Sequence, residues 1–209
     1  MAIVPRPSLE RLVRIERLLH WEELKGNSRI TSALLGKMLN VPGNTIRKDL
    51  SWLGSGGQVK QGYEVKKLRQ IIRQKLKISA SVNAAVVGLS NLGLTLLKPT
   101  FWGEAGIEIK AGFEDSINKL ETINATVPLY PEYELKEKVE QLKIELVLLS
   151  VTDAQHQQTL ERLKGSMIKG IINLTTRILP EKVGHILIRN IDLGVELKLL
   201  QARINQEEL

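Results

Sequence analysis

A glycine-bounded turn placed directly after an apolar run restricts the fold of this chain more than any other feature. Residues 84–87 read Ala-Ala-Val-Val, the turn is Gly88-Leu-Ser-Asn-Leu-Gly93, and a helical stretch follows over residues 94–98. A strand, a glycine turn and a helix in this order are typical of the first unit of a parallel α/β sheet that binds a dinucleotide. We therefore predict an α/β domain in the C-terminal part of the chain.

The rest of the C-terminal two thirds repeats this rhythm. Apolar runs of strand length alternate with helical stretches and lie at residues 107–113, 146–151, 168–174 and 186–188. This alternation predicts a Rossmann-like parallel sheet.

Two positions decide how well the turn suits a dinucleotide. The middle glycine of the full fingerprint is replaced by Ser90, whose side chain either adds a hydrogen bond to a phosphate or crowds the diphosphate. Glu114 ends the second predicted strand, 21 residues after Gly93, where an acidic residue accepts a ribose hydroxyl, although a Glu at a strand end is also often a solvated turn residue. The predicted NAD(H) site comprises Gly88, Ser90, Asn91, Leu92, Gly93, Glu114, Thr152 and Thr175.

Charge divides the chain into two parts of opposite sign. Residues 1–78 hold 16 Lys plus Arg against 6 Asp plus Glu, a net charge of +10, whereas residues 79–209 hold 14 against 17, a net charge of −3. A basic module joined to a nearly neutral one indicates a polyanionic partner such as nucleic acid. The alternative is a solvated basic face on an ordinary domain.

The motifs of the basic part favour DNA. Apolar spacing predicts a helix over residues 8–25, a second helix capped by Thr31 or Ser32, a turn at residues 40–44 and a third helix over Thr45–Leu53, which together form a helix-turn-helix. Ile46 and Leu50 lie four apart and face the core, so the other positions at the start of the third helix are exposed. The predicted DNA contacts there are Asn44, Thr45, Arg47, Lys48 and Ser51. An Arg can grip a guanine edge, whereas a Lys more often meets phosphate.

A glycine-rich segment follows the third helix. Residues 54–63 hold four glycines around Lys60, which predicts a hairpin wing whose basic tip enters the minor groove, or else only a turn. The basic helix after it, over residues 65–77, is either a linking helix with a solvated face or a second phosphate contact.

Composition argues against several other functions. The chain has no Cys, and His20, His156 and His185 are far apart, so we expect no disulfide, thiol catalyst or metal site. No suitably placed acid or base accompanies the dinucleotide motif, so we expect a regulator and not an enzyme. The chain lacks an apolar run of membrane-spanning length and a signal-peptide pattern, so we expect a cytoplasmic protein without membrane contact.

These observations predict three parts. Residues 1–78 form a winged-helix DNA-binding domain, residues 79–192 a Rossmann-like NAD(H)-binding domain, and residues 193–209 a C-terminal dimerisation helix. Asp192 is a good N-cap for the last helix, whose apolar stripe lies either on its own domain or on a second copy. Because a DNA reader of this kind needs two half-sites, we expect a homodimer that binds double-stranded operator DNA.

Five stretches together resemble the Rex family of NADH-sensing redox repressors, which join a winged helix-turn-helix to a Rossmann domain and dimerise through exchanged C-terminal helices. The stretches are Val41–Gly54 with Ile-Arg-Lys-Asp-Leu-Ser at 46–51, Gly62-Tyr63, Val87–Gly93, Lys169–Asn173 and Arg189–Leu193.

The resemblance implies a role for single residues. It implies that Arg47 and Lys48 lie in the major groove and Lys60 in the minor groove. It likewise implies that the Gly88–Gly93 turn holds the pyrophosphate and that Glu114, in the place of the usual Asp, holds the adenosine ribose. Arg17 and Asp192 resemble the family's ion pair between the two domains, which can couple the state of the cofactor to the spacing of the recognition helices.

The sequence departs from the family at three places on the sensing side. Ser90 replaces the middle Gly, Leu174-Thr-Thr176 stands where a Phe-Ala-Pro stretch is usual, and Lys98-Pro99 occupies a region where relatives can carry a Tyr. We predict a repressor that binds its operator as a homodimer and is released by NADH. The alternatives are a Rex-like DNA-binding regulator whose NAD(H) sensing is lost or altered and, on Rossmann spacing alone, an NAD-dependent oxidoreductase.

Overall fold

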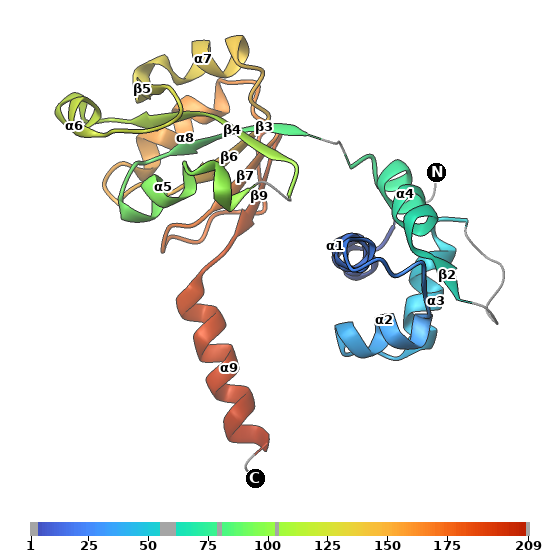
Figure 1. The fold of residues 1–209 in the computed structure, drawn as a ribbon. Helices are drawn as coiled ribbons and strands as arrows, with labels where there is room; N and C mark the ends of the chain where they lie inside the picture. The colour runs from blue at the N-terminus through green and yellow to red at the C-terminus, as the bar shows by residue number, and fades with distance from the viewer. Residues whose placement is uncertain (1–3, 55–61, 79–80, 103–104, 208–209) are drawn as a thin grey trace. The chain divides into compact units, whose positions relative to one another are not determined.

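The computed structural model of the chain describes residues 4–54, 62–78, 81–102 and 105–207. The chain divides into two compact units, Met1–Ser79 and Ala80–Leu209 (Figure 1). Within the described ranges, no helix combines the length and the hydropathy that a membrane crossing needs.

The N-terminal unit is helical with one small sheet. Its elements are α1 (Arg6–Leu24), β1 (Arg29–Ile30), α2 (Ser32–Leu39), α3 (Gly43–Ser51), β2 (Tyr63–Glu64) and α4 (Val65–Leu76), with β1 and β2 antiparallel. Apolar side chains from all four helices and from β1 form one core, which includes Leu12, Ile30, Leu35, Ile46, Leu50 and Leu68. The helices predicted from apolar spacing are therefore present, and α2 and α3 form the predicted pair around a tight turn.

The turn between α2 and α3 is tighter than predicted. The third helix was predicted to begin at Thr45, but α3 begins at Gly43, because Pro42 is its N-cap and accepts a hydrogen bond from the Thr45 N–H at 2.9 Å. Asn40 adopts the left-handed conformation at the end of α2. At the second helix, Thr31 is the N-cap, and its side chain accepts a hydrogen bond from the Leu34 N–H at 3.1 Å.

The C-terminal unit contains a seven-stranded sheet with the order β5-β4-β3-β6-β7-β9-β8. The strands are β3 (Val82–Val87), β4 (Ile107–Glu114), β5 (Leu129–Pro131), β6 (Leu146–Leu149), β7 (Gly170–Asn173), β8 (Lys182–Val183) and β9 (Ile186–Asn190). Neighbouring strands pair in parallel except β8 and β9, which pair antiparallel. The predicted Rossmann-like parallel sheet is confirmed; the short strands β5 and β8 were not predicted.

Helices cover both faces of this sheet (Figure 1). One core lies with α7 (Leu135–Gln141) and α8 (His156–Lys164) and includes Phe113, Val139 and Leu163. The other lies with α5 (Asn91–Leu96) and α6 (Ile117–Thr122) and includes Leu89, Leu96 and Leu97. Two short 3₁₀ helices, η1 (Pro99–Phe101) and η2 (Glu132–Glu134), complete the connections. The helix predicted over residues 94–98 begins three residues earlier, at Asn91, because the Leu94 N–H bonds the Ser90 carbonyl at 2.8 Å.

The chain ends in α9 (Leu193–Glu207), which the sequence predicts as an amphipathic helix. Asp192 caps it as expected: its Oδ1 accepts the N–H of Gly194 at 2.8 Å and of Val195 at 3.2 Å. None of the described side chains of α9 is buried, and Leu193 and Leu197 are 70 % and 68 % exposed. The apolar stripe of α9 is therefore uncovered in a single chain.

Candidate functional site

The first candidate site lies at the carboxyl ends of β3 and β6. From β3 the chain first builds one half of the sheet through β4 and β5, and it then crosses to β6 and builds the other half. In open α/β sheets this reversal of strand order leaves a crevice in which ligands bind. Gly88 follows β3, and Ser150 follows β6 beside it.

Glycine is required at both ends of the turn. Gly88 has φ +88°, and a Cβ on it would lie 2.6 Å from the carbonyl carbon and oxygen of Ser150. A Cβ on Gly93 would lie 2.0 Å from the carbonyl oxygen of Gly88. The turn therefore packs against β6 on one side and against α5 on the other, as the first and third glycines of the dinucleotide fingerprint do.

The middle of the turn is open to solvent. Ser90, Asn91 and Leu92 are exposed, and Ser90 is the N-cap residue of α5 without a capping bond from its own side chain. Instead, the Ser90 Oγ lies 3.2 Å from the Ser150 Oγ, so the two hydroxyls share a hydrogen bond. The serine is thus held by the residue that follows β6, and the backbone after Ser90 is the part of such a turn that meets a pyrophosphate.

Glu114 ends β4 as predicted, but it is not a solvated turn residue. It is 3 % exposed, and its Oε2 accepts the Leu89 N–H at 3.0 Å and the Lys119 Nζ at 2.6 Å. Burial by itself would raise the pKa of Glu114, but the hydrogen bonds from Lys119, Leu89 and Ser116 outweigh it, and the pKa is lowered. The carboxylate is therefore ionised beside the glycine turn.

Thr152 and Thr175 follow the neighbouring parallel strands β6 and β7 and so lie at the same edge of the sheet as Gly88. Thr152 is exposed and donates to the Gln155 Oε1 at 2.8 Å. Thr175 is 9 % exposed, and its hydroxyl donates to the Asn173 Oδ1 at 2.7 Å. Both residues stay predictions as nucleotide contacts.

Two asparagines connect this edge to the start of α9. The Asn173 Nδ2 donates to the Asn190 Oδ1 at 2.7 Å, and the Asn190 amide also bonds both backbone groups of Leu179, at 3.0 and 2.8 Å. The loop after β7 and the end of β9 are therefore joined by side-chain amides. Both residues lie in stretches that carry the family resemblance, but the sequence does not show that they meet.

A buried polar network at the ends of β4 and β5 was also missed. Glu132 is 2 % exposed and accepts hydrogen bonds from Thr159, at 2.7 Å, and from Arg162, which also bonds Asp115 at 3.1 Å. Burial raises the pKa of Glu132, although Thr159 and Arg162 act against this rise. The network was missed because β5, the strand that positions Glu132, is too short for its periodicity to be recognised.

His156, at the start of α8, is a buried polar residue. It is 2 % exposed, and its Nε2 has no hydrogen-bond partner within the described ranges. Burial, followed by the nearby Arg177, lowers the pKa of this imidazole. The described residues contain no group of three or more His, Asp and Glu side chains that could hold a metal ion.

The second candidate site is the exposed face of α3. Ile46 and Leu50 are buried as predicted. Of the predicted DNA contacts, Asn44, Arg47, Lys48 and Ser51 are exposed and Thr45 is half-buried. The Arg47 Nη1 donates to the Ser32 Oγ at 3.1 Å, which ties its guanidinium to the start of α2, and the Ser51 hydroxyl donates to the Lys48 carbonyl at 2.6 Å. Lys60, the predicted wing tip, lies outside the described residues.

A buried ion pair sets α3 against α1. Asp49 is 1 % exposed and accepts the Arg11 Nε at 2.6 Å and Nη2 at 2.9 Å. Hydrogen bonding to Asp49 raises the pKa of Arg11, although burial lowers it. The sequence offered one signal of this burial: Asp49 lies three residues after Ile46 and therefore on the same face of the helix. The signal was missed because Asp49 follows Arg47 and Lys48, and a carboxylate in a run of charged residues is usually exposed to solvent.

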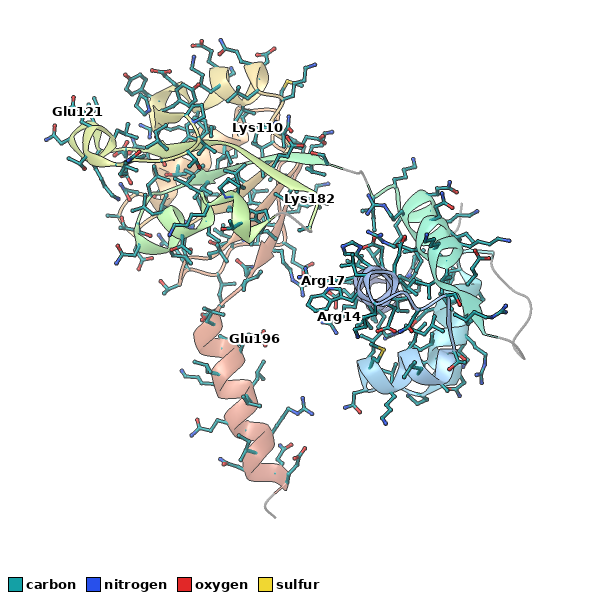
Figure 2. The ribbon with its side chains drawn as sticks, viewed as in Figure 1. Arg14, Arg17, Lys110, Glu121, Lys182 and Glu196 are labelled. Atoms are coloured by element: carbon teal, nitrogen blue, oxygen red, sulfur yellow. The ribbon has the colours of Figure 1, made fainter. Side chains whose placement is uncertain are left out.

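Arg17 and Asp192 belong to different units, so their ion pair stays a prediction. Arg17 is exposed on α1, where it projects beside Arg14 (Figure 2). A groove of 390 Å³ on this unit is lined by Arg14, Arg17, Leu18, Trp21 and Leu39.

Comparisons with known proteins identify the family of the chain. Residues 3–51 match the family described as "Putative DNA-binding protein N-terminus". The chain is 34 % identical over 183 residues to the redox-sensing transcriptional repressor Rex of Pediococcus pentosaceus, with 88 % of each chain covered. It is 31 % identical over 198 residues to Rex of Listeria welshimeri, with 94 % of this chain and 91 % of the relative covered.

Solved structures give the same result over the whole chain. The crystal structure of RSP, a Rex-family repressor, matches with a TM-score of 0.83 and 26 % identity, and covers 100 % of this chain and 98 % of that one. RSP in complex with β-NAD⁺ and operator DNA matches with a TM-score of 0.86 and 26 % identity, and covers 100 % and 95 %. Identity above 30 % over most of the chain, with both halves of the fold in common, shows that this chain belongs to the Rex family of redox-sensing transcriptional repressors.

Proposed function

We propose that this chain represses transcription by binding operator DNA as a homodimer and leaves the operator when NADH replaces NAD⁺. The observation that carries the proposal is the presence, in one Rex-family chain, of an exposed polar recognition helix and a glycine turn beside a buried, ionised Glu114. The related repressor RSP has been solved with β-NAD⁺ and operator DNA and also with β-NADH.

The residues of the turn fit a dinucleotide. Gly88 and Gly93 keep the turn as tight as the fingerprint requires. The Ser90 hydroxyl is bonded to Ser150, which holds this side chain in place beside the turn. The exposed backbone at residues 90–92 would hold the pyrophosphate, and Glu114 would accept a hydroxyl of the adenosine ribose. The bound nucleotide supplies the redox signal, because its oxidised and reduced forms differ in charge and shape at the nicotinamide.

On the DNA side, Arg47 and Lys48 would lie in the major groove, with Asn44, Thr45 and Ser51 contacting base or backbone and Lys60 reaching the minor groove. Arg47 is held by Ser32, which pre-orients its guanidinium for a bidentate contact. The proposed pair between Arg17 and Asp192 would connect the DNA-binding unit to the base of α9.

NADH can release the operator only if it binds the DNA-free form of the protein more tightly than the DNA-bound form. To shift a population from 1:99 to 99:1, NADH must favour the released form by about 5.5 kcal/mol. The test is a titration of operator binding with NADH and NAD⁺ at fixed salt. We expect NADH to release the DNA and NAD⁺ to leave it bound, and equal binding with either nucleotide would overturn the redox half of the proposal.

The homodimer is supported by α9. Its apolar side chains are exposed, and a contiguous exposed apolar patch of this kind marks an interaction surface. The groove of the N-terminal unit offers Leu18, Trp21 and Leu39 flanked by two arginines, which suits an apolar helix of a second copy that carries Glu196 in its first turn. Light scattering at working concentration tests this assembly, and a monomer would contradict it.

A second candidate is a DNA-binding member that no longer responds to NAD(H). The replacement of the middle glycine by Ser90 favours it, and so does Thr175, whose hydroxyl is already bonded within its own loop. Calorimetry with NADH, NAD⁺ and other adenine nucleotides separates the two, because selective NADH binding excludes this candidate. We propose a regulator and not an oxidoreductase; nicotinamide turnover with a small alcohol, acid or aldehyde would reverse that assignment.

A further inference from the structure

Lys119, a residue that the sequence patterns did not point to, contacts the acidic group of the nucleotide site. It lies on α6, five residues after Glu114, and its Nζ donates to the Glu114 Oε2 at 2.6 Å. The Lys119 side chain is 41 % exposed, whereas that of Glu114 is 4 % exposed. The ammonium group therefore lies between solvent and a buried carboxylate.

The two oxygens of Glu114 are used unequally. Oε2 accepts both the Lys119 ammonium and the Leu89 N–H, whereas among the described residues Oε1 accepts only the Ser116 N–H, at 3.4 Å. An ionised carboxylate has about four acceptor positions. The fold thus fixes Oε2 and leaves Oε1 with acceptor capacity for a ligand.

We propose that Lys119 is a positioning residue for nucleotide recognition, which holds the Glu114 carboxylate ionised and oriented so that Oε1 is free to accept a ribose hydroxyl. The inference rests on the proposed NAD(H) site and deepens it. Lys119 acts through Glu114 and need not touch the nucleotide.

The other charges at this corner cannot replace Lys119. Asp115 follows Glu114 directly and is paired with Arg162 on α8, and Arg162 also bonds the buried Glu132 of η2. In the part of the chain that the structure describes, Lys119 is the cation that bonds Glu114. Without Lys119, only the N–H groups of Leu89 and Ser116 would oppose the effect of burial, and the pKa of Glu114 would rise.

The same corner provides a matched control. Lys98 and Lys119 both line a cavity of 510 Å³ next to α5 and α6, together with Thr122, Asn124 and Thr126. Lys98 is exposed and does not bond Glu114. Lys98→Met therefore removes a positive charge from the same cavity and leaves the Glu114 carboxylate with its partner.

The experiment measures NADH affinity by calorimetry on the full-length protein between pH 5.5 and 8.5. The variants are Lys119→Met, Lys119→Arg, Lys98→Met, Glu114→Gln and the double variant Lys119→Met/Glu114→Gln. In Lys119→Met the pKa of Glu114 should rise. At pH 5.5 we expect NADH binding to weaken by about tenfold for each unit by which this raised pKa exceeds the pH. Lys119→Arg and Lys98→Met should follow the wild-type profile, and Lys119→Met should have no further effect once Glu114 is Gln.

Three results would overturn the inference: wild-type affinity of Lys119→Met at every pH, an equal loss in Lys98→Met, or additive losses in the double variant. A second measurement separates this failure from failure of the proposed function. Carbon NMR of the Glu114 carboxyl in the nucleotide-free protein should show its pKa higher in Lys119→Met than in wild type. Absence of NADH binding by the wild type refutes the proposed site and its ribose contact, and an unchanged Glu114 pKa refutes the action of Lys119.

Discussion

Removal of the Arg11 guanidinium should destabilise the DNA-binding unit strongly. Arg11→Met leaves the Asp49 carboxylate, which is 1 % exposed, without the two hydrogen bonds of 2.6 and 2.9 Å that hold it. Breaking a buried ion pair in this way costs about 3–5 kcal/mol, because an uncompensated charge stays buried. The Arg11 side chain is 24 % exposed, so water can enter the space that it leaves and solvate part of the Asp49 carboxylate. We therefore expect a loss of unfolding free energy at the lower end of this range, about 3 kcal/mol.

The measurement is urea unfolding of the full chain, followed by tryptophan fluorescence in a Trp102→Phe background, so that the signal comes from Trp21 and Trp52 of the N-terminal unit. The matched control is Arg11→Met/Asp49→Leu, which removes both charges. Replacing a buried pair by apolar groups is often close to neutral, so the double variant should recover most of the loss. A loss of unfolding free energy below about 1 kcal/mol for Arg11→Met is the range of an exposed ion pair. Such a result would refute the argument that Asp49 depends on the Arg11 guanidinium.

Three further predictions concern the two sites. Arg47→Ala should weaken operator binding by about 1–3 kcal/mol and relax specificity at one base pair, as measured by gel shift on single-base operator variants; an equal loss on every sequence would identify a phosphate contact instead. Gly93→Ala should lower both the unfolding midpoint of the C-terminal unit and NADH affinity, because its Cβ would lie 2.0 Å from the Gly88 carbonyl oxygen; wild-type behaviour in both assays would contradict the packing described for the turn. Because the pKa of Glu114 is lowered on folding, the stability it contributes is present above the pKa of an unfolded Glu, about 4.3, and is lost as the pH falls through the lowered folded value. Unfolding experiments between pH 5 and pH 3 should therefore show a smaller acid loss for Glu114→Gln than for wild type, and parallel curves would show that Glu114 has no such linkage.

The sequence predicted those features that depend on local spacing. Ile46 and Leu50 identified the buried face of α3, and the glycines at positions 88 and 93 identified the turn after β3, because both signals repeat within a few residues. The same spacing rule could have placed Asp49 on the buried face but was not applied to it, and its partner Arg11 lies 38 residues away on α1. Ser150, the partner of Ser90, is likewise 60 residues distant. Contacts of this kind follow from packing and not from the local pattern.

The missed strands have a related explanation. β5 and β8 span three and two residues, too few for a period of two to be visible, and β5 ends at a proline. Glu132 follows β5 directly, so the buried network with Thr159 and Arg162 was missed together with the strand.

The amide contact between Asn173 and Asn190 gives α9 a mechanical property. This contact and the bonds from Asn190 to Leu179 join the loop after β7 to the last residue of β9, so the base of α9 is tied to the edge of the sheet that carries Thr175. A helix of 15 residues is about 22 Å long, so a tilt of about 5° at its base displaces its far end by about 2 Å. A rearrangement near Thr175 that tilted the helix by this angle would therefore displace its C-terminal end by about the size of a methyl group.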